Sequence, residues 1–197
     1  MNPTSEQMKD EILKQKAQAR EIKRRFENAE KAKALADELF LGEKWICVEE
    51  GIYLSPRRAV GKKSNYADEL RAAQILRDSE STVYLVPESS RQPGKKYDAI
   101  VNGLKFEIKT IGGNANTLEH QFLRSRSQAP NVFINLENAI LTRREILSAL
   151  FGARNKPETD KIHGYAYYNK FQGGLIVIKI KNQENLIYLN VNDLQAR

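Results

Sequence analysis

The chain has 197 residues, enough for one domain with an appendage, and a net charge of +7 with a pI near 9.4. It has no apolar run near the roughly 20 residues that a membrane span needs, and its polar, charged start lacks a signal-peptide core, so a soluble chain is expected. A single cysteine, Cys47, excludes an internal disulfide, and with only two histidines any metal is expected to be held by oxygen.

The first predicted element is one long helix over residues 5 to 40, which contain no glycine or proline and are rich in helix formers. Its apolar positions form a heptad-like stripe, interrupted by Gln15 and Lys33, and docking of this stripe on the rest of the protein is favoured over a coiled coil. The stripe consists of Ile12, Ala19, Ile22, Phe26, Ala29, Ala36 and Phe40. Gly42 is typical of a helix end, so an N-terminal helical segment 1–45 is separated from a domain over 46–197.

The domain is predicted to alternate helices and strands. Residues 44 to 54 are expected to be extended, and a helix over about 65–78 precedes a strand at 82–86. A hairpin at 97–110 is followed by a helix at about 116–128 and a buried strand at 131–136. Thr142 with Glu145 forms a capping box that opens another helix, and residues 173–191 indicate a C-terminal hairpin. The central order αβββαβ predicts an α/β fold with helices packed on a mixed sheet.

The hairpin "KYDAIVNGLKFEIKT" places two acids close together. Asn102-Gly103 predicts a type I′ turn, and a two-residue loop then puts Asp98 opposite Glu107. Carboxylates directly opposite have Cβ atoms roughly 4.5 to 5.5 Å apart and cost up to about 1 kcal/mol through repulsion. Lys109 lies two residues after Glu107 and therefore projects to the same side.

Two explanations account for this repulsion. Lys96, Lys105 and Lys109 could neutralise the acids in a solvated ladder, which the residues alone favour. A divalent metal is the alternative, because hard cations pair one or two carboxylates with water and substrate phosphate.

The element order, with Asp98 on the second strand and Glu107-Ile108-Lys109 on the third, resembles the PD-(D/E)xK nuclease superfamily. More narrowly, residues 64 to 151 resemble the C-terminal tRNA-nuclease toxin domains of bacterial contact-dependent growth inhibition proteins. Tyr97 stands where the superfamily has its nominal proline, a tolerated variation.

The resemblance implies a role for each matching position, and with it a metal site becomes the preferred explanation. Asp98, Glu107 and the Ile108 carbonyl would hold Mg²⁺ or Mn²⁺. Lys109 would orient or activate the attacking water and stabilise charge on the phosphate. Many members add an acid from the first helix, where Glu69 stands, with Asp68 as its competitor and a solvated helix face as the alternative for either.

Basic residues flank this site and suggest a nucleic-acid partner, since such contacts position phosphates without reading sequence. The candidates are Lys95 and Lys96 before it and Arg124 and Arg126 after it, with surface solubility as the alternative. The aromatic stretch "HGYAYYNKF" at 163–171 could stack unpaired bases, although packing on the sheet is favoured.

The leading hypothesis is a metal-dependent endonuclease acting on RNA, and from the closer resemblance on tRNA. The alternatives are a DNA endonuclease of the same fold, a non-catalytic nucleic-acid-binding module, and a metal-independent RNase that uses His163. By fold-level analogy, a toxin domain would act in the cytoplasm, belong to a larger secreted protein and meet an immunity protein.

Overall fold

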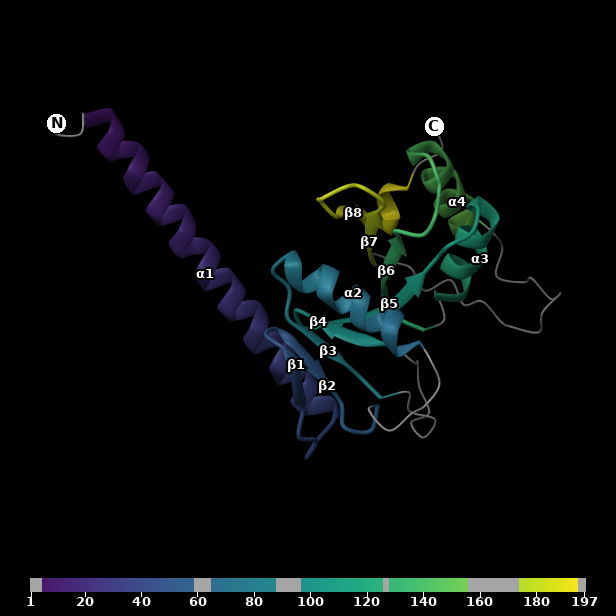
Figure 1. Ribbon diagram of the computed structural model, residues 1–197, viewed down its shortest axis with the longest axis horizontal. Helices are drawn as coiled ribbons and strands as arrows, with labels where there is room; N and C mark the ends of the chain where they lie inside the picture. Colours follow the sequence, from purple (N-terminus) through teal and green to yellow (C-terminus); the bar gives the residue numbers. More distant parts are fainter. Residues whose placement is uncertain (1–4, 59–64, 88–96, 126–127, 156–173, 195–197) are drawn as a thin grey trace.

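The computed structural model describes residues 5–58, 65–87, 97–125, 128–155 and 174–194, with side chains from Leu13 onward. A long helix leads into one eight-stranded sheet whose strands lie side by side in chain order (Figure 1). The elements are α1 (Ser5–Leu39), β1 (Ile46–Glu49), β2 (Ile52–Leu54), α2 (Tyr66–Asp78), β3 (Val83–Leu85), β4 (Ala99–Val101), β5 (Leu104–Thr110), α3 (Ala115–Ser125), β6 (Asn131–Leu136), α4 (Arg143–Asn155), β7 (Leu175–Ile180) and β8 (Ile187–Asn190). The predicted α/β class and the αβββαβ order are confirmed.

The sheet is mixed because three of its strand pairs are joined by helices. The pairs β2–β3, β5–β6 and β6–β7 are parallel, and the other four are antiparallel. Parallel neighbours need a crossover, which α2, α3 and α4 supply in turn. The antiparallel β7–β8 pair is the predicted C-terminal hairpin.

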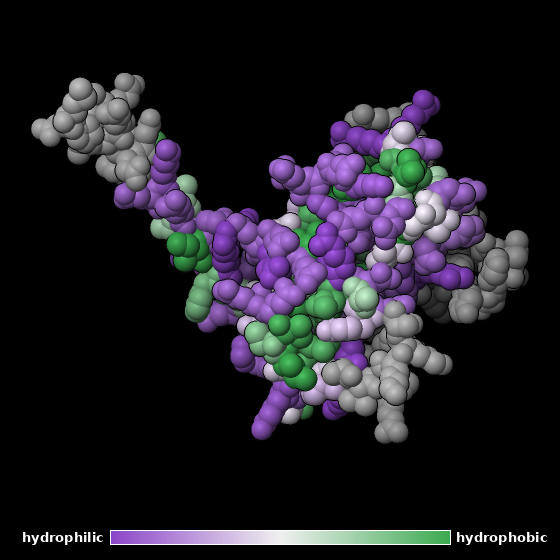
Figure 2. Space-filling view, in the orientation of Figure 1, coloured by the Kyte–Doolittle hydropathy of each residue, from purple (hydrophilic) through white to green (hydrophobic). Residues whose placement is uncertain are grey.

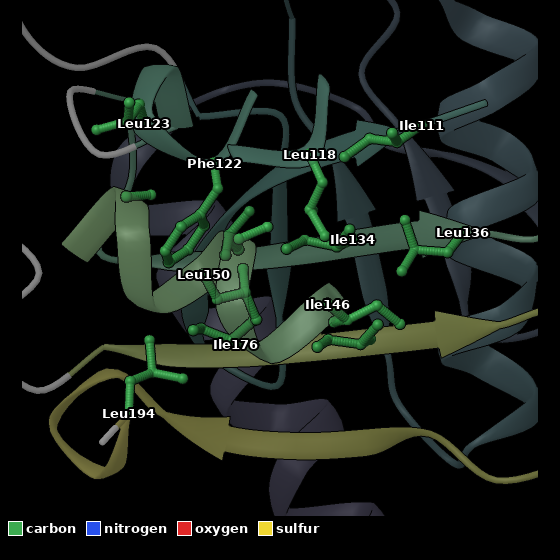
Figure 3. Packing of buried hydrophobic residues seen from close by; sticks show 14 of the residues in the cluster. Ile111, Leu118, Phe122, Leu123, Ile134, Leu136, Ile146, Leu150, Ile176 and Leu194 are labelled. Carbon is green, nitrogen blue, oxygen red and sulfur yellow. The ribbon is translucent and has the colours of Figure 1, made fainter. Parts of the chain in front are cut away.

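The two faces of the sheet are covered by different helices. On one face α2 packs over alternate residues of β2 to β7, such as Leu85, Phe106 and Phe133. On the opposite face α3 and α4 cover β6 and β7, where Phe122 and Leu150 meet Ile176 (Figure 3). Side chains alternate along a strand. Phe106 and Ile108 of β5 therefore lie on the face that α2 covers, and Glu107 between them lies on the opposite face.

The last turns of α1 share the face with α3 and α4 but lie over β3 and β4. Ala32 and Ala36 are fully buried there against Tyr84 and Ile100. The rest of α1 extends away from the sheet (Figure 1). The predicted docking of the apolar stripe is confirmed for Ala36 and Phe40, which pack on the domain. It is wrong for Ile22 and Phe26, which are 67% and 64% exposed, because the helix has left the sheet at these positions.

Local signals at helix ends behave as the sequence indicates. The Thr142 N–H donates to Glu145 Oε2 at 2.7 Å, and the Glu145 N–H donates to Thr142 Oγ1 at 3.3 Å. This reciprocal pair is the predicted capping box, and it opens α4. Within the described part of the chain, no helix has the length and apolar character needed to cross a membrane.

Candidate functional site

The β4–β5 hairpin carries the candidate site. Its turn residues Asn102 and Gly103 have φ of 49° and 81°, the positive values that a type I′ turn requires. The observed pairs are Val101 with Leu104, Ile100 with Lys105 and Ala99 with Phe106. The turn and the register are therefore as predicted up to Ala99.

Asp98 departs from that register. The Asp98 N–H donates to the Phe106 carbonyl at 2.9 Å, while the Asp98 carbonyl accepts from the Val86 N–H at 3.1 Å. The regular ladder ends at the Ala99–Phe106 pair, so the prediction that Asp98 stands directly opposite Glu107 is wrong in detail. Its carboxylate instead turns toward β5, where Oδ2 accepts the Ile108 N–H at 2.9 Å.

Glu107 is the most unusual ionisable group of the site. It is only 1% exposed, and burial, followed by the nearby Asp98 carboxylate, raises its pKa from 4.5 to about 8. Lys109 opposes this shift through an ion pair with Glu107 Oε1. The second oxygen, Oε2, is buried and accepts no hydrogen bond among the described residues. A hydrogen bond that the protonated Glu107 carboxyl donates to Asp98 also raises its pKa.

Lys109 and the Ile108 carbonyl complete the predicted group. The Lys109 side chain is 19% exposed and thus lies between the buried Glu107 carboxyl and solvent. The N–H and C=O of one strand residue point to the same side in an antiparallel ladder. Because the Ile108 N–H points to Asp98, its carbonyl faces that side of the strand as well, and its role as a ligand stays a prediction.

The site lies between two packed regions of one sheet face. Glu107 is paired with Val132 and Lys109 with Ile134 in the parallel β5–β6 ladder, and both partners belong to the core under α3 and α4. Ile100, on the other side, belongs to the core under α1. The acids therefore stand on a rigid, central part of the sheet.

Glu69 is placed elsewhere. It lies on α2, is 5% exposed and forms an ion pair with the buried Arg58. Arg58 also donates to the Val86 carbonyl, which holds the pair against the end of β3. Among the described residues, no group of three or more His, Cys, Asp or Glu could hold a metal, so Glu69 is not gathered with Asp98 and Glu107.

The predicted nucleic-acid contacts are only partly described. Arg124 is exposed in the last turn of α3. Lys95, Lys96 and Arg126, like the aromatic stretch at 163–171, lie outside the described residues.

Two further polar residues lie near the site, and the sequence reasoning missed one of them, Asn131. Lys105, one of the lysines expected to neutralise the acids, lies on β5 with its Nζ 5.2 Å from the centre of the Tyr97 ring. Asn131 is buried and joins two strands, because its Nδ2 donates to the Lys105 carbonyl at 3.0 Å and its Oδ1 accepts from the Leu175 N–H at 3.0 Å. The available signal for Asn131 was an asparagine at the start of a strand whose next three residues are apolar.

The acid pair fits a hard divalent cation. A buried carboxylate oxygen without a donor costs free energy, and two carboxylates with a backbone carbonyl are ligands that Mg²⁺ and Mn²⁺ prefer. Lys109 forms an ion pair with Glu107 Oε1 and so offsets the cost of burying that oxygen, but it does not contact Oε2.

Comparison with known proteins adds little to this geometry. No family model matches the chain, and no curated protein matches it at a significant level. Among solved structures, the chain is similar to the CdiA-CT/CdiI toxin and immunity complex from Burkholderia pseudomallei, with 19% sequence identity and a TM-score of 0.45, over 70% of this chain and 98% of that chain. At this identity and TM-score the likeness assigns neither a family nor an activity.

Proposed function

We propose that this protein is a metal-dependent nuclease that hydrolyses phosphodiester bonds at Asp98, Glu107 and Lys109. The observation that carries the proposal is the buried Glu107 carboxyl, whose Oε2 accepts no hydrogen bond within the described residues while a second carboxyl, that of Asp98, lies within hydrogen-bond reach of it. A like-charged neighbour and a missing donor both raise the free energy of the ionised form. A bound divalent cation would offset both.

Asp98, Glu107 and the Ile108 carbonyl would hold the ion, which we propose to be Mg²⁺ or Mn²⁺. When bound, it would supply Lewis acidity toward a phosphoryl oxygen and toward water. Asp98 is held for this role by the Ile108 N–H, which fixes one of its oxygens and leaves the other available.

Lys109 would act on the substrate. Its ammonium pairs with Glu107 Oε1 and is partly exposed, so a cation that takes over the carboxylate would release it toward solvent. A positive charge there would contact a phosphate oxygen, orient the attacking water and stabilise the charge that develops during cleavage. No histidine is required for this chemistry.

The proposed substrate is RNA, and within RNA it is tRNA, on the strength of the sequence resemblance over residues 64–151. The net charge of +7 agrees with a polyanionic partner. The same resemblance leads us to propose a toxin domain of a contact-dependent growth inhibition protein, part of a larger secreted chain, which acts in the cytoplasm of a target cell and is covered by an immunity protein.

The test is a cleavage assay with tRNA, other RNA and duplex DNA, each with Mg²⁺, Mn²⁺ or a chelator. We expect cleavage of tRNA that stops with the chelator and in Glu107→Gln but continues in the matched control Glu184→Gln, which changes an exposed glutamate on the β7–β8 turn. If duplex DNA alone is cleaved, the substrate is DNA and the proposal that it is RNA is wrong. Cleavage that persists in the chelator, or no cleavage of any substrate, would overturn the proposal.

A further inference from the structure

The projecting part of α1 carries large apolar side chains in solvent. Ile22 and Phe26 are 67% and 64% exposed, and Leu13 is 64% exposed. Figure 2 shows apolar side chains among hydrophilic ones along this helix, beyond the point where it leaves the sheet. A soluble helix normally turns such residues toward a partner.

Ile22 and Phe26 belong to a heptad seam. Ala19, Ile22, Phe26 and Ala29 alternate steps of three and four, which assigns them to positions a, d, a and d. In the sequence, Ile12 continues the repeat at an a position, whereas Leu13 falls at b, outside the seam. At 3.6 residues per turn, the centre of this seam is rotated by about 110° from the side that docks on the sheet.

The domain leaves the seam open. The docking side is formed by buried residues such as Ala32 and Ala36. Arg24 and Arg25 form ion pairs with Glu80, which lies in the turn between α2 and β3. α1 is thus held to its own domain through its last turns, whereas the part of the seam from Ala19 to Phe26 is exposed.

We propose that this seam binds a second copy of the chain as a parallel two-stranded coiled coil. In a parallel pair, each g position faces the e position of the next heptad in the partner helix. Arg25 at g then faces Glu30 of the second copy, and the sequence repeats the opposite-charge relation with Glu11 at g and Lys16 at e. An antiparallel pair would instead bring e positions together, and three of the four e positions, Lys9, Lys16 and Lys23, are lysines.

In the monomer, the ion pairs of α1 still allow Arg25 to contact Glu30 of a second copy. Glu30 is exposed. Arg25 already meets Glu80 through Nη2 and lies 3.6 Å from Glu21 through Nε, but a guanidinium has five N–H donors in all. Because two seam positions are alanine and Gln15 interrupts the repeat, the association should be weak and depend on concentration.

The oligomeric state of the full chain tests the proposal. Sedimentation velocity over a roughly hundredfold range of concentration should show a monomer that converts to a dimer. Phe26→Glu should raise the dissociation constant by roughly tenfold or more, because it places a charge in the seam. Leu13→Glu is the matched control, since Leu13 and Phe26 are both 64% exposed, and it should leave the constant unchanged.

A cross-linking experiment tests the orientation. With Cys47→Ser removing the native thiol, Ile22→Cys should form disulfide-linked dimers under mild oxidation, because d positions of a parallel pair meet each other, whereas Leu13→Cys should not. A chain that stays monomeric throughout the concentration range would overturn the proposal. So would a dimer that Phe26→Glu and Leu13→Glu weaken equally, or one that Ile22→Cys fails to trap. None of these outcomes bears on nuclease activity.

Discussion

Without a bound metal, Glu107 should make the protein less stable as pH rises. Its folded-state pKa of about 8 lies above the ordinary value of 4.5, so between these pH values the folded state binds more protons than the unfolded state. The free energy of unfolding therefore falls as pH increases through this window. Below about pH 4.5 the carboxyl is protonated in both states and its contribution to the pH dependence vanishes.

The size of the effect follows from the gap between the two pKa values. From 4.5 to about 8, at about 1.36 kcal/mol per pKa unit, the full loss is about 5 kcal/mol. That is a large part of the roughly 5 to 15 kcal/mol by which a domain is stable. The physical cause is the transfer of a carboxylate from water to a buried position beside Asp98, which Lys109 offsets only in part.

Urea unfolding in a chelator, at about pH 5 and about pH 8.5, measures this loss. Glu107→Gln removes the titrating group, so between these two pH values the wild type should lose about 4 kcal/mol more than this variant, since part of the full loss falls below pH 5. Glu184→Gln, the exposed control, should follow the wild type. Equal pH dependence in the wild type and Glu107→Gln would refute the idea that Glu107 is forced to be neutral.

Three further outcomes are expected. Asp98→Asn keeps an oxygen for the Ile108 N–H and should fold, but Mn²⁺ affinity measured by calorimetry should fall roughly tenfold or more; an unchanged isotherm would exclude Asp98 as a ligand. Lys109→Ala should reduce kcat by about 10²–10⁴ with Mn²⁺ affinity retained, and undiminished cleavage would remove its proposed role. Glu69→Ala should lower the free energy of unfolding in urea by about 3–5 kcal/mol, because it removes the carboxylate that pairs with the buried Arg58. The double variant Arg58→Met with Glu69→Leu should change the free energy of unfolding little. An unchanged stability of Glu69→Ala would contradict the buried ion pair.

The features that the sequence predicted well are those that depend on neighbouring residues. The Asn102-Gly103 turn sets the hairpin register because its backbone requirements are local, and Thr142 with Glu145 caps α4 for the same reason. Alternation of apolar and polar residues then assigns Glu107 and Lys109 to one face. These signals need no knowledge of the rest of the fold.

The features that the sequence could not predict depend on distant contacts. Asp98 leaves the ladder next to β3, where its carbonyl accepts from Val86, and no local pattern marks that step. The partner of Glu69 is Arg58, eleven residues earlier in the chain, and no local pattern indicates that the two form a buried ion pair. α1 extends beyond the edge of the domain, so Ile22 and Phe26 stay exposed although they belong to the same predicted stripe as the docked Ala36.

The most direct test of the central claim is calorimetric titration of the full chain with Mn²⁺ near pH 7, in buffers of different ionisation enthalpy. Because burial beside Asp98 raises the pKa of Glu107 to about 8, the carboxyl should be mostly protonated before binding and should release about one proton per ion bound. We predict binding with that proton release in the wild type and Glu184→Gln, and neither in Glu107→Gln. Binding that is the same in Glu107→Gln, or no binding to the wild type, would contradict the claim that Asp98 and Glu107 hold a metal.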